Sequence, residues 1–245
     1  MKNYPKELYY LGNSDLLQKQ KVSIVGSRKP NKYAVNKTYE IANKLSKRGV
    51  VIVSGGALGI DTIAHKASGL NNTIMVSGTG LDIRYPTINK TMIKEIEQNG
   101  LVLSQFKTDT PSLRRNFVLR NEIIVALGDV LIVSYADTNS GTMRSVEYGL
   151  KMGKKIYVLP HRIGESEGTN YLLENKLATP ILNIDKFVEQ FGNDLTKKIE
   201  TKDDILDFCK NNPSYEEAYK KFGETILEYE LNGDIIINNG TIFVT

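Results

Sequence analysis

The sequence of 245 residues has few of the side chains that form disulfides or bind transition metals: one cysteine and two histidines. Cys209 has no second cysteine to pair with, which excludes an internal disulfide and fits a reducing compartment. It lies in the helical pattern ILDFCKNN, where we expect a small buried apolar residue and not a reactive thiol. With so few ligands of this kind, a metal site is not expected.

Long hydrophobic runs are also missing. The stretch MKNYPKELYYLGNSDLL at the start of the chain has no continuous apolar core, and no later run reaches the length of a membrane span. We therefore expect neither a signal peptide nor a membrane helix. Together with the single cysteine, this predicts a cytoplasmic protein.

Motifs for catalysis and for nucleotide cofactors are absent as well. Neither the dinucleotide fingerprint GxGxxG nor the P-loop pattern occurs, and there is no nucleophile elbow, HExxH, CxxC or carboxylate cluster. Asp61 and His65 stand one helical turn apart and could form an acid–base pair, but such pairs more often have a structural role. The sequence thus predicts no cofactor, no metal and no enzymatic activity.

Charge is distributed unevenly along the chain. The formal net charge is +4, yet residues 196–245 contain six lysines and ten acidic residues, a net of −4. The rest of the chain must therefore carry a net of +8. A nucleic acid would be attracted to this first part and not to the tail, although many enzymes for anionic metabolites have a comparable charge.

What the sequence does contain is a regular alternation of apolar and amphipathic segments. Short apolar runs, such as KVSIV at 21–25, alternate with helical patterns, such as NKYAVNKTYEIANKLSKRG at 31–49. Continuously apolar strands between helices are typical of a parallel sheet that is covered on both faces. We predict a Rossmann-like, doubly wound α/β domain over residues 1–192, with a short leading segment at 1–20 and roughly six or seven mostly parallel strands.

The remainder of the chain predicts a small second domain. Residues 193–202 have the polar character of a linker. Residues 203–245 contain three short helical patterns and then two β-type runs joined by Asn-Asn-Gly, which is a hairpin signal. Three helices and a hairpin outline a winged helix, so we predict a winged-helix-like domain near the smallest size that folds alone.

Small and polar residues follow several of the predicted strands. Because ligands of open parallel sheets lie beyond the carboxyl ends of the strands, these segments should gather at one edge. Free backbone N–H groups near helix starts suit an anion such as phosphate, although glycine at such a turn often only permits a tight backbone. The candidate residues are Gly26, Ser27, Arg28, Lys29, Ser54, Gly55, Gly56, Ser140, Gly141 and Thr142.

One loop combines cations with an aromatic residue. In TPSLRRNFVLRNEII, at 110–124, Arg114, Arg115 and Arg120 surround Phe117, with Asn121 beside them. Arginine offers charge to a phosphate and phenylalanine offers a stacking face to a base, as a single-stranded nucleic-acid site requires. The alternative is a buried Phe117 that starts a helix among solvated arginines, and composition alone leaves both interpretations open.

Taken together, these motifs resemble the DNA-processing protein A family, also called Smf. The chain contains VGSRKP, SGGALGIDTIAH, GTGLDIRYP, FVLRNEIIVALGDVLIVSYADTNSGTM and VLP in the order of the family pattern. PKELYYLGNSDLL resembles the entry segment of the family, and the whole resemblance covers about residues 5–185. Some positions depart from that pattern. Leu58 stands where arginine is frequent, Ser104-Gln105 replaces SE, Pro160-His161 replaces PG, and the N-terminal helical domain of many members is missing.

The resemblance implies a protein that binds and protects single-stranded DNA entering during natural transformation and loads the RecA recombinase onto it. It also implies a homodimer built through the Rossmann-like domain, without a nucleotide cofactor. By the same resemblance, Arg28 would hold a backbone phosphate, while Arg114 and Phe117 would take the cation and stacking positions.

The resemblance extends to two further groups of residues. Ser54, Gly55 and Gly56 would bring backbone N–H groups to a phosphate. Arg120 and Asn121 match the RN of the family pattern, which does not distinguish a DNA contact from a structural role.

Two other functions are weighed against this one. The first is a phosphoribohydrolase for nucleoside monophosphates, with the pattern PGGxGTxxE, which TNSGTMRSVE resembles at Gly141-Thr142. Ser145 stands at the glutamate position, however, and Glu147 comes two residues late. The second is a protein that binds duplex DNA through the winged helix, which the net charge of −4 in the tail disfavours.

Overall fold

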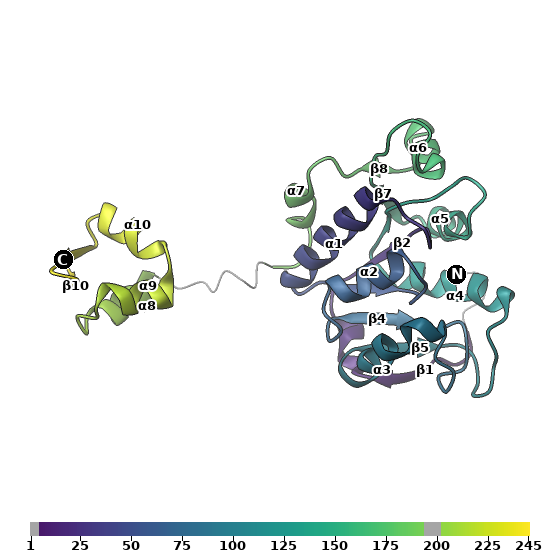
Figure 1. The fold of residues 1–245 in the computed structure, drawn as a ribbon, viewed down its shortest axis with the longest axis horizontal. Coiled ribbons are helices and arrows are strands. Elements are labelled where there is room, and N and C mark those ends of the chain that lie inside the picture. The colour runs from purple at the N-terminus through teal and green to yellow at the C-terminus, as the bar shows by residue number, and fades with distance from the viewer. Residues whose placement is uncertain (1–4, 194–201) are drawn as a thin grey trace. The chain divides into compact units, whose positions relative to one another are not determined.

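The computed structural model describes residues 5–193 and 202–245 and divides the chain into two compact units, 1–195 and 196–245 (Figure 1). The first unit is an α/β domain, and the second contains three helices and a hairpin. Within the described parts of the chain, no helix combines the length and the apolar character needed to cross a bilayer.

An eight-stranded sheet forms the centre of the first unit, in the order β1-β5-β4-β3-β2-β6-β7-β8. Neighbouring strands from β2 to β8 run parallel, whereas β1 runs antiparallel to β5. This confirms the predicted Rossmann-like, mostly parallel α/β fold. The strands are β1 (Tyr9–Gly12), β2 (Lys21–Val25), β3 (Val51–Ser54), β4 (Thr73–Val76), β5 (Leu101–Ser104), β6 (Val130–Val133), β7 (Lys155–Val158) and β8 (Thr179–Pro180).

Helices cover both faces of the sheet because its strands are apolar on both sides. On one face, α1, α2 and α7 pack against alternate strand residues such as Ile24 and Ile52, and α1 lies beside α2 (Figure 1). On the other face, α4, α5 and α6 pack against residues such as Val25 and Val53. The helices are α1 (Lys32–Lys47), α2 (Ile60–Ala67), α3 (Lys90–Asn99), α4 (Arg114–Leu127), α5 (Gly141–Lys151), α6 (Glu167–Glu174) and α7 (Ile184–Val188), with short 3₁₀ turns at Ser14–Gln18 and Thr87–Asn89.

Strand β1 is the one strand of the sheet that the sequence pattern did not predict. Its side chains are largely exposed at the sheet edge, with Tyr10 57% and Leu11 39% accessible, so it lacks the continuous apolar run of a central strand. Gly12 has φ of +100°, and a Cβ there would lie 2.2 Å from the carbonyl oxygen of Gly100. Glycine is therefore required where β1 ends against the start of β5.

The order of the strands creates a switch point between β2 and β6. From β2 the chain proceeds outward through β3, β4 and β5, and it then returns to place β6 on the other side of β2. The loops that follow β2 and β6 therefore diverge at the carboxyl edge of the sheet. In open α/β sheets this crevice is where ligands bind.

The second unit contains α8 (Lys202–Cys209), α9 (Tyr215–Phe222), α10 (Thr225–Leu231) and the antiparallel hairpin of β9 (Ile235–Asn238) and β10 (Thr241–Val244). Asn239 and Gly240 both have positive φ, as a two-residue hairpin turn of type I′ requires. Cys209 is fully buried in this core, as expected. The winged-helix interpretation stays a prediction, and the predicted linker 193–202 lies, apart from its two ends, outside the described residues.

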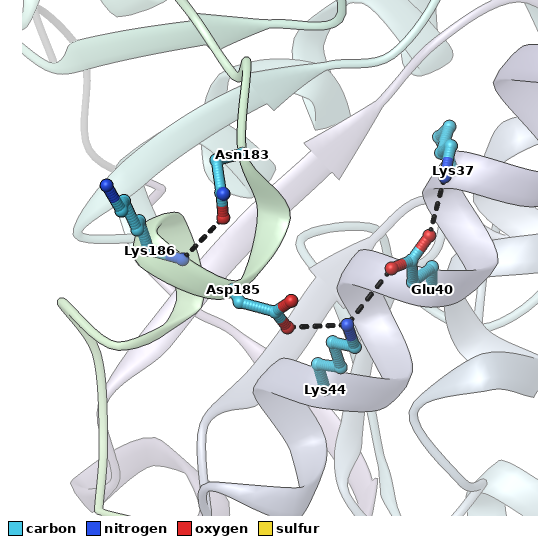
Figure 2. Close-up of polar contacts among 6 residues, drawn as sticks. All are labelled: Lys37, Glu40, Lys44, Asn183, Asp185 and Lys186. Carbon is cyan, nitrogen blue, oxygen red and sulfur yellow. Dashed lines mark hydrogen bonds and ion pairs between the residues drawn. The ribbon is translucent and has the colours of Figure 1, made fainter.

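Ion pairs join α7 to α1 on one face of the sheet (Figure 2). The Lys44 ammonium contacts Glu40 on its own helix at 3.0 Å and Asp185 on α7, while Lys37 contacts Glu40 at 2.9 Å. The two lysines hold the pKa of the Glu40 carboxyl below its ordinary value. These groups are partly exposed, so water and salt screen them, and such pairs contribute only about 0–1 kcal/mol each.

Apolar packing under α7 is more extensive than its ion pairs. The Asn183 side chain accepts a hydrogen bond from the Lys186 backbone N–H at 2.9 Å, which caps the start of the helix (Figure 2). Phe187 is buried, and its ring lies 4.9 Å from that of Tyr157 and 5.2 Å from that of Phe191, centroid to centroid. Burial of these rings therefore dominates the attachment of α7 to the sheet.

We expect Phe187→Ala to lower the free energy of unfolding by about 3–5 kcal/mol, because it removes a buried ring and leaves a cavity. Asp185→Asn, which removes only the exposed ion pair, should cost less than about 1 kcal/mol. Denaturant unfolding of the two variants checks this. Equal losses would mean that the ion pairs, and not the packing, hold α7 in place.

Candidate nucleic-acid interface

The loops after β2 and β6 are joined directly at the switch point. The backbone N–H of Ser27 donates to the carbonyl oxygen of Tyr135 at 2.8 Å, and the Ser27 hydroxyl oxygen accepts from the backbone N–H of Lys29 at 3.1 Å. Gly26 lies beneath this loop, where a Cβ would come within 2.5 Å of the Ile60 side chain. The loop is thus held against α2 while its next two residues, Arg28 and Lys29, are exposed.

Four cations at this edge are exposed and have no acidic partner. Arg28 and Lys29 follow β2, and Arg114 and Arg115 begin α4. Among the residues that the structure describes, none of these four side chains forms an ion pair. Their charge is therefore available to an external anion.

Arg114 and Arg115 lie at the N-terminus of α4, where their positive charge does not stabilise the helix. The N-terminus of a helix carries partial positive charge, which favours acidic residues and disfavours basic ones. The first turn of α4 has no acidic residue, and its N-cap, Leu113, makes no side-chain hydrogen bond. An anion bound here would neutralise both arginines and satisfy the free backbone N–H groups of the first turn.

Phe117 lies on the same helix and is only partly buried. One side of its ring packs so closely on Gly78 that a Cβ at Gly78 would lie 2.5 Å from Cδ1 of the ring. Its ring centroid is 5.3 Å from that of Tyr85, with the planes inclined by 40°. Phe117 thus combines the two interpretations left open by the sequence: it packs on the protein and is still partly accessible beside the exposed arginines.

Tyr85 is a site residue that the sequence reasoning did not select. It is 39% exposed and its ring packs on Phe117, so the two rings together form a larger aromatic surface. The signal was present in the motif GTGLDIRYP, because a tyrosine that follows a glycine-rich strand end has a ring suited to stacking.

Arg120, by contrast, is buried and cannot offer its charge at the surface. It is 4% exposed, and its Nη1 donates to the carbonyl oxygen of Val76 at 2.8 Å. Its guanidinium lies 5.8 Å from the centre of the Phe117 ring, and burial lowers its pKa to about 10, with Asp61 acting in the opposite direction. It remains charged at neutral pH and joins α4 to the end of β4, which favours the structural role of the two that the family pattern leaves open.

The turn after β3 also has a packing role in this structure. The Ser54 hydroxyl donates to the carbonyl oxygen of Ile24 at 2.7 Å, and Ser54, Gly55 and Gly56 are all buried. A Cβ on Gly55 would lie 1.7 Å from Nη1 of Arg120, so glycine makes room for the buried guanidinium. This differs from the expectation that the turn presents its N–H groups to a phosphate.

The remaining candidates lie near the start of α5. Gly141 is exposed with open space around its Cα, while Ser140 and Thr142 are partly exposed. Ser140 occupies the N-cap position without making a side-chain cap, and its Oγ has no hydrogen-bond partner in the described structure. Asn121, one turn after Phe117 on α4, is partly buried. The Ser140 hydroxyl is therefore a buried polar group without a partner, while Gly141 and Thr142 are accessible at the start of α5.

Asp61 and His65 are both buried, which supports their structural role. The Thr73 hydroxyl donates to the Ile52 carbonyl at 2.8 Å, so its oxygen accepts from Nδ1 of His65 at 2.7 Å. Burial, with a smaller effect of Arg120, lowers the pKa of His65 to about 3. Burial raises the pKa of Asp61, whose carboxylate accepts from the Ala57 N–H at 3.3 Å. Neither side chain can reach a substrate.

Comparison with known proteins agrees with this arrangement. The profile of the family described as DNA recombination-mediator protein A matches residues 1–192. The DNA processing protein DprA of Streptococcus pneumoniae is 39% identical over 181 residues, which cover 71% of this chain and 64% of that protein. Protein Smf of Escherichia coli is 34% identical over 177 residues, covering 70% of this chain and 47% of that protein. The chain spans about half to two thirds of the length of these relatives.

Solved structures show the same fold. DNA processing protein A from Helicobacter pylori, studied for its single-stranded DNA binding mode, has a TM-score of 0.76 at 45% identity, covering 78% of this chain and 88% of that one. The X-ray structure of the Streptococcus pneumoniae protein has a TM-score of 0.70 at 36% identity, covering 75% of this chain and 66% of that one.

Fold and edge together define a Rossmann-like α/β protein with exposed cations and an aromatic surface beside its switch point. The chain belongs to the DNA recombination-mediator protein A family. This confirms the resemblance to the DNA-processing protein A motifs noted in its sequence.

The buried neutral His65 predicts that acid destabilises the protein. The unfolded chain binds a proton at the ordinary histidine pKa of 6.5, whereas the folded ring does so only at about 3. Stability from this residue is therefore complete above pH 6.5 and declines as the pH falls, by up to about 1.4 kcal/mol per pH unit. Denaturant unfolding between pH 7 and 5 should show a shallower decline for His65→Asn, which retains a donor toward Thr73. Identical pH dependence in both proteins would contradict a neutral buried ring.

Proposed function

We propose that the chain binds single-stranded DNA along the carboxyl edge of its sheet. The observation that supports this most directly is that the carboxyl edge of the sheet carries four exposed cations without ion pairs in the described structure, together with the partly exposed ring of Phe117. Phosphates of a flexible strand would neutralise the cations, and a base would stack on the ring. A structure of the related Helicobacter pylori protein, which concerns single-stranded DNA binding, adds support.

Each residue then has a definite role in the proposed complex. Arg28 and Lys29 hold phosphates near the switch point, and Arg114 and Arg115 hold phosphates at the start of α4. Phe117, enlarged by Tyr85, supplies the stacking face. Arg120 contacts no DNA; it is a positioning residue that joins α4 to β4.

The proposed biological role rests on membership of the family. We propose that the chain protects DNA that enters in natural transformation, loads the RecA recombinase onto it, acts as a homodimer and works in the cytoplasm. In this role it alters no covalent bond and uses no cofactor. Membership of a recombination-mediator family supports these proposals.

The rival phosphoribohydrolase function has little support from the geometry. Ser145, at the position of the expected glutamate, is buried on α5. The carboxylate of Glu147 accepts from Arg144 on the exposed side of the same helix at 3.0 Å. No carboxylate therefore stands in the expected place beside Gly141-Thr142. Duplex binding by the tail remains disfavoured by its net charge.

Arg28→Ala should weaken binding of a single-stranded oligonucleotide and make the logarithm of affinity less steeply dependent on salt. Each lost phosphate contact reduces that slope by about 0.7 for single strands. Fluorescence anisotropy titrations at several salt concentrations measure it. Lys151→Ala removes an exposed charge from the far end of α5 and serves as the control. An unchanged slope in Arg28→Ala would mean that Arg28 touches no phosphate.

Phe117→Ala should reduce affinity for single-stranded DNA by about tenfold, because stacking contributes about 1–3 kcal/mol per base. Phe117→Tyr keeps the ring and should bind nearly as well as the wild type. Circular dichroism of both variants establishes that they are folded. If the alanine variant is folded and binds with unchanged affinity, Phe117 is not a stacking residue.

A further inference from the structure

A pocket opens at the carboxyl edge of the sheet, on the other side of β2 from Phe117. It has a volume of about 400 Å³, within the range of small-molecule sites. Its lining comes from the start of α1 and from the loop after β7, and none of it is used in the DNA site described above. The lining residues are Asn31, Lys32, Tyr33, Pro160, His161, Arg162 and Glu165.

An aromatic wall of this pocket is held rigidly. Nε2 of His161 lies 2.8 Å from the carbonyl oxygen of Ser134, and because a carbonyl only accepts, Nε2 is the donor. The His161 ring contacts Tyr33 edge-on at 5.4 Å and Tyr135 at 5.1 Å, centroid to centroid. Tyr33 is nevertheless 42% exposed, so part of its ring is available to a flat ligand.

Charged groups of both signs surround the aromatic wall. Lys32 and Arg162 are exposed, and neither side chain forms an ion pair among the described residues. Glu165 is partly buried, and its carboxylate accepts from the Asn31 side chain at 3.1 Å. The Asn31 side chain also accepts from the backbone N–H of Ala34 at 2.8 Å, which caps α1. The carboxylate is therefore fixed in position.

This combination matches a nucleotide better than it matches a simple anion. Two cations suit a phosphate, and an exposed tyrosine ring suits a base. The fixed carboxylate of Glu165 would repel a second phosphate, yet it can accept hydrogen bonds from the N–H groups on the edge of a base. The lining thus separates a phosphate side from a base side.

The position of the pocket connects it to the proposed DNA path. Asn31 comes three residues after Arg28, and β7, whose loop forms the other wall, is separated from β2 by β6 alone. A strand that passes Phe117 and then Arg28 reaches this pocket next along the edge. We propose, on the basis of the proposed function, that the pocket is a further nucleotide subsite, which receives a base on Tyr33 and its phosphate on Lys32 and Arg162.

A length series of single-stranded oligothymidylates tests this with the full chain. Affinity is measured by fluorescence anisotropy for strands from about 3 to about 16 nucleotides, the range of known site sizes. Tyr33→Ala and Lys32→Ala should bind the shortest strands like the wild type. Beyond the length that reaches the pocket, Tyr33→Ala should bind about fivefold or more weakly.

Matched controls lie on the same helix, outside the pocket. Tyr39→Ala removes a tyrosine that is 53% exposed, and Lys47→Ala removes an exposed charge at the opposite end of α1. Both should behave like the wild type at every length. Longer strands can also gain affinity by binding two protomers at once. This gain is the same in variant and wild type, so comparing them at each length isolates the effect of the subsite.

Several results would overturn the proposal. Tyr33→Ala could bind like the wild type at all lengths, or lose affinity equally at all lengths, and either result removes a separate subsite. If thymidine monophosphate bound the wild type and not Tyr33→Ala, while DNA affinity stayed the same, the pocket would be a site for free nucleotides instead. A wild-type protein that bound no oligonucleotide would refute the proposed function itself, and the subsite with it.

Discussion

The carboxyl edge of the sheet, where we propose that DNA binds, depends most on the buried guanidinium of Arg120. A buried charge is costly unless it is hydrogen-bonded and compensated. Here the Val76 carbonyl accepts from Nη1, the Asp61 carboxylate lies near enough to favour the charged form, and the ring of Phe117 faces it. The hydrogen bond joins α4 to the end of β4, Asp61 belongs to α2, and Gly55, directly after β3, leaves the space that the guanidinium needs.

Arg120 thereby holds α4, whose first turn carries Arg114 and Arg115, against the end of β4. Arg114 and Arg115 lie at the N-terminus of α4, where the helix dipole disfavours positive charge. Neither arginine has an acidic partner in the described structure, so a bound anion would offset this unfavourable interaction. After β2, the loop is held by backbone hydrogen bonds and not by a buried side chain, and Arg28 is exposed. At the start of α4 and in the loop after β2, buried contacts fix the backbone while the cationic side chains stay exposed.

The alternation of apolar runs with helical patterns was enough to predict the parallel sheet and its carboxyl edge. The roles of individual residues within the edge were harder to predict. Arg114 and Arg120 look equivalent in the sequence, but three residues complete only about five sixths of a helical turn. Arg114, Phe117 and Arg120 therefore lie on different sides of α4, where they are exposed, partly buried and buried, respectively. The glycines at 55 and 56 suggest a turn that binds phosphate, but Gly55 lies against Arg120 and Gly56 lies against Met75, two residues that come later in the chain. Strand β1 escaped prediction because an exposed edge strand lacks the apolar run of a central one.

The central claim is that this edge binds a flexible polyanion through charge and stacking together. Duplex DNA has the charge, but its bases are already stacked on each other and unavailable to Phe117. Parallel titrations of single-stranded and duplex oligonucleotides of the same sequence, in the same salt and without added nucleotide, test the claim most directly. The account predicts clearly tighter binding of the single strand. Equal affinity for both forms, or no binding of either at low ionic strength, would contradict it.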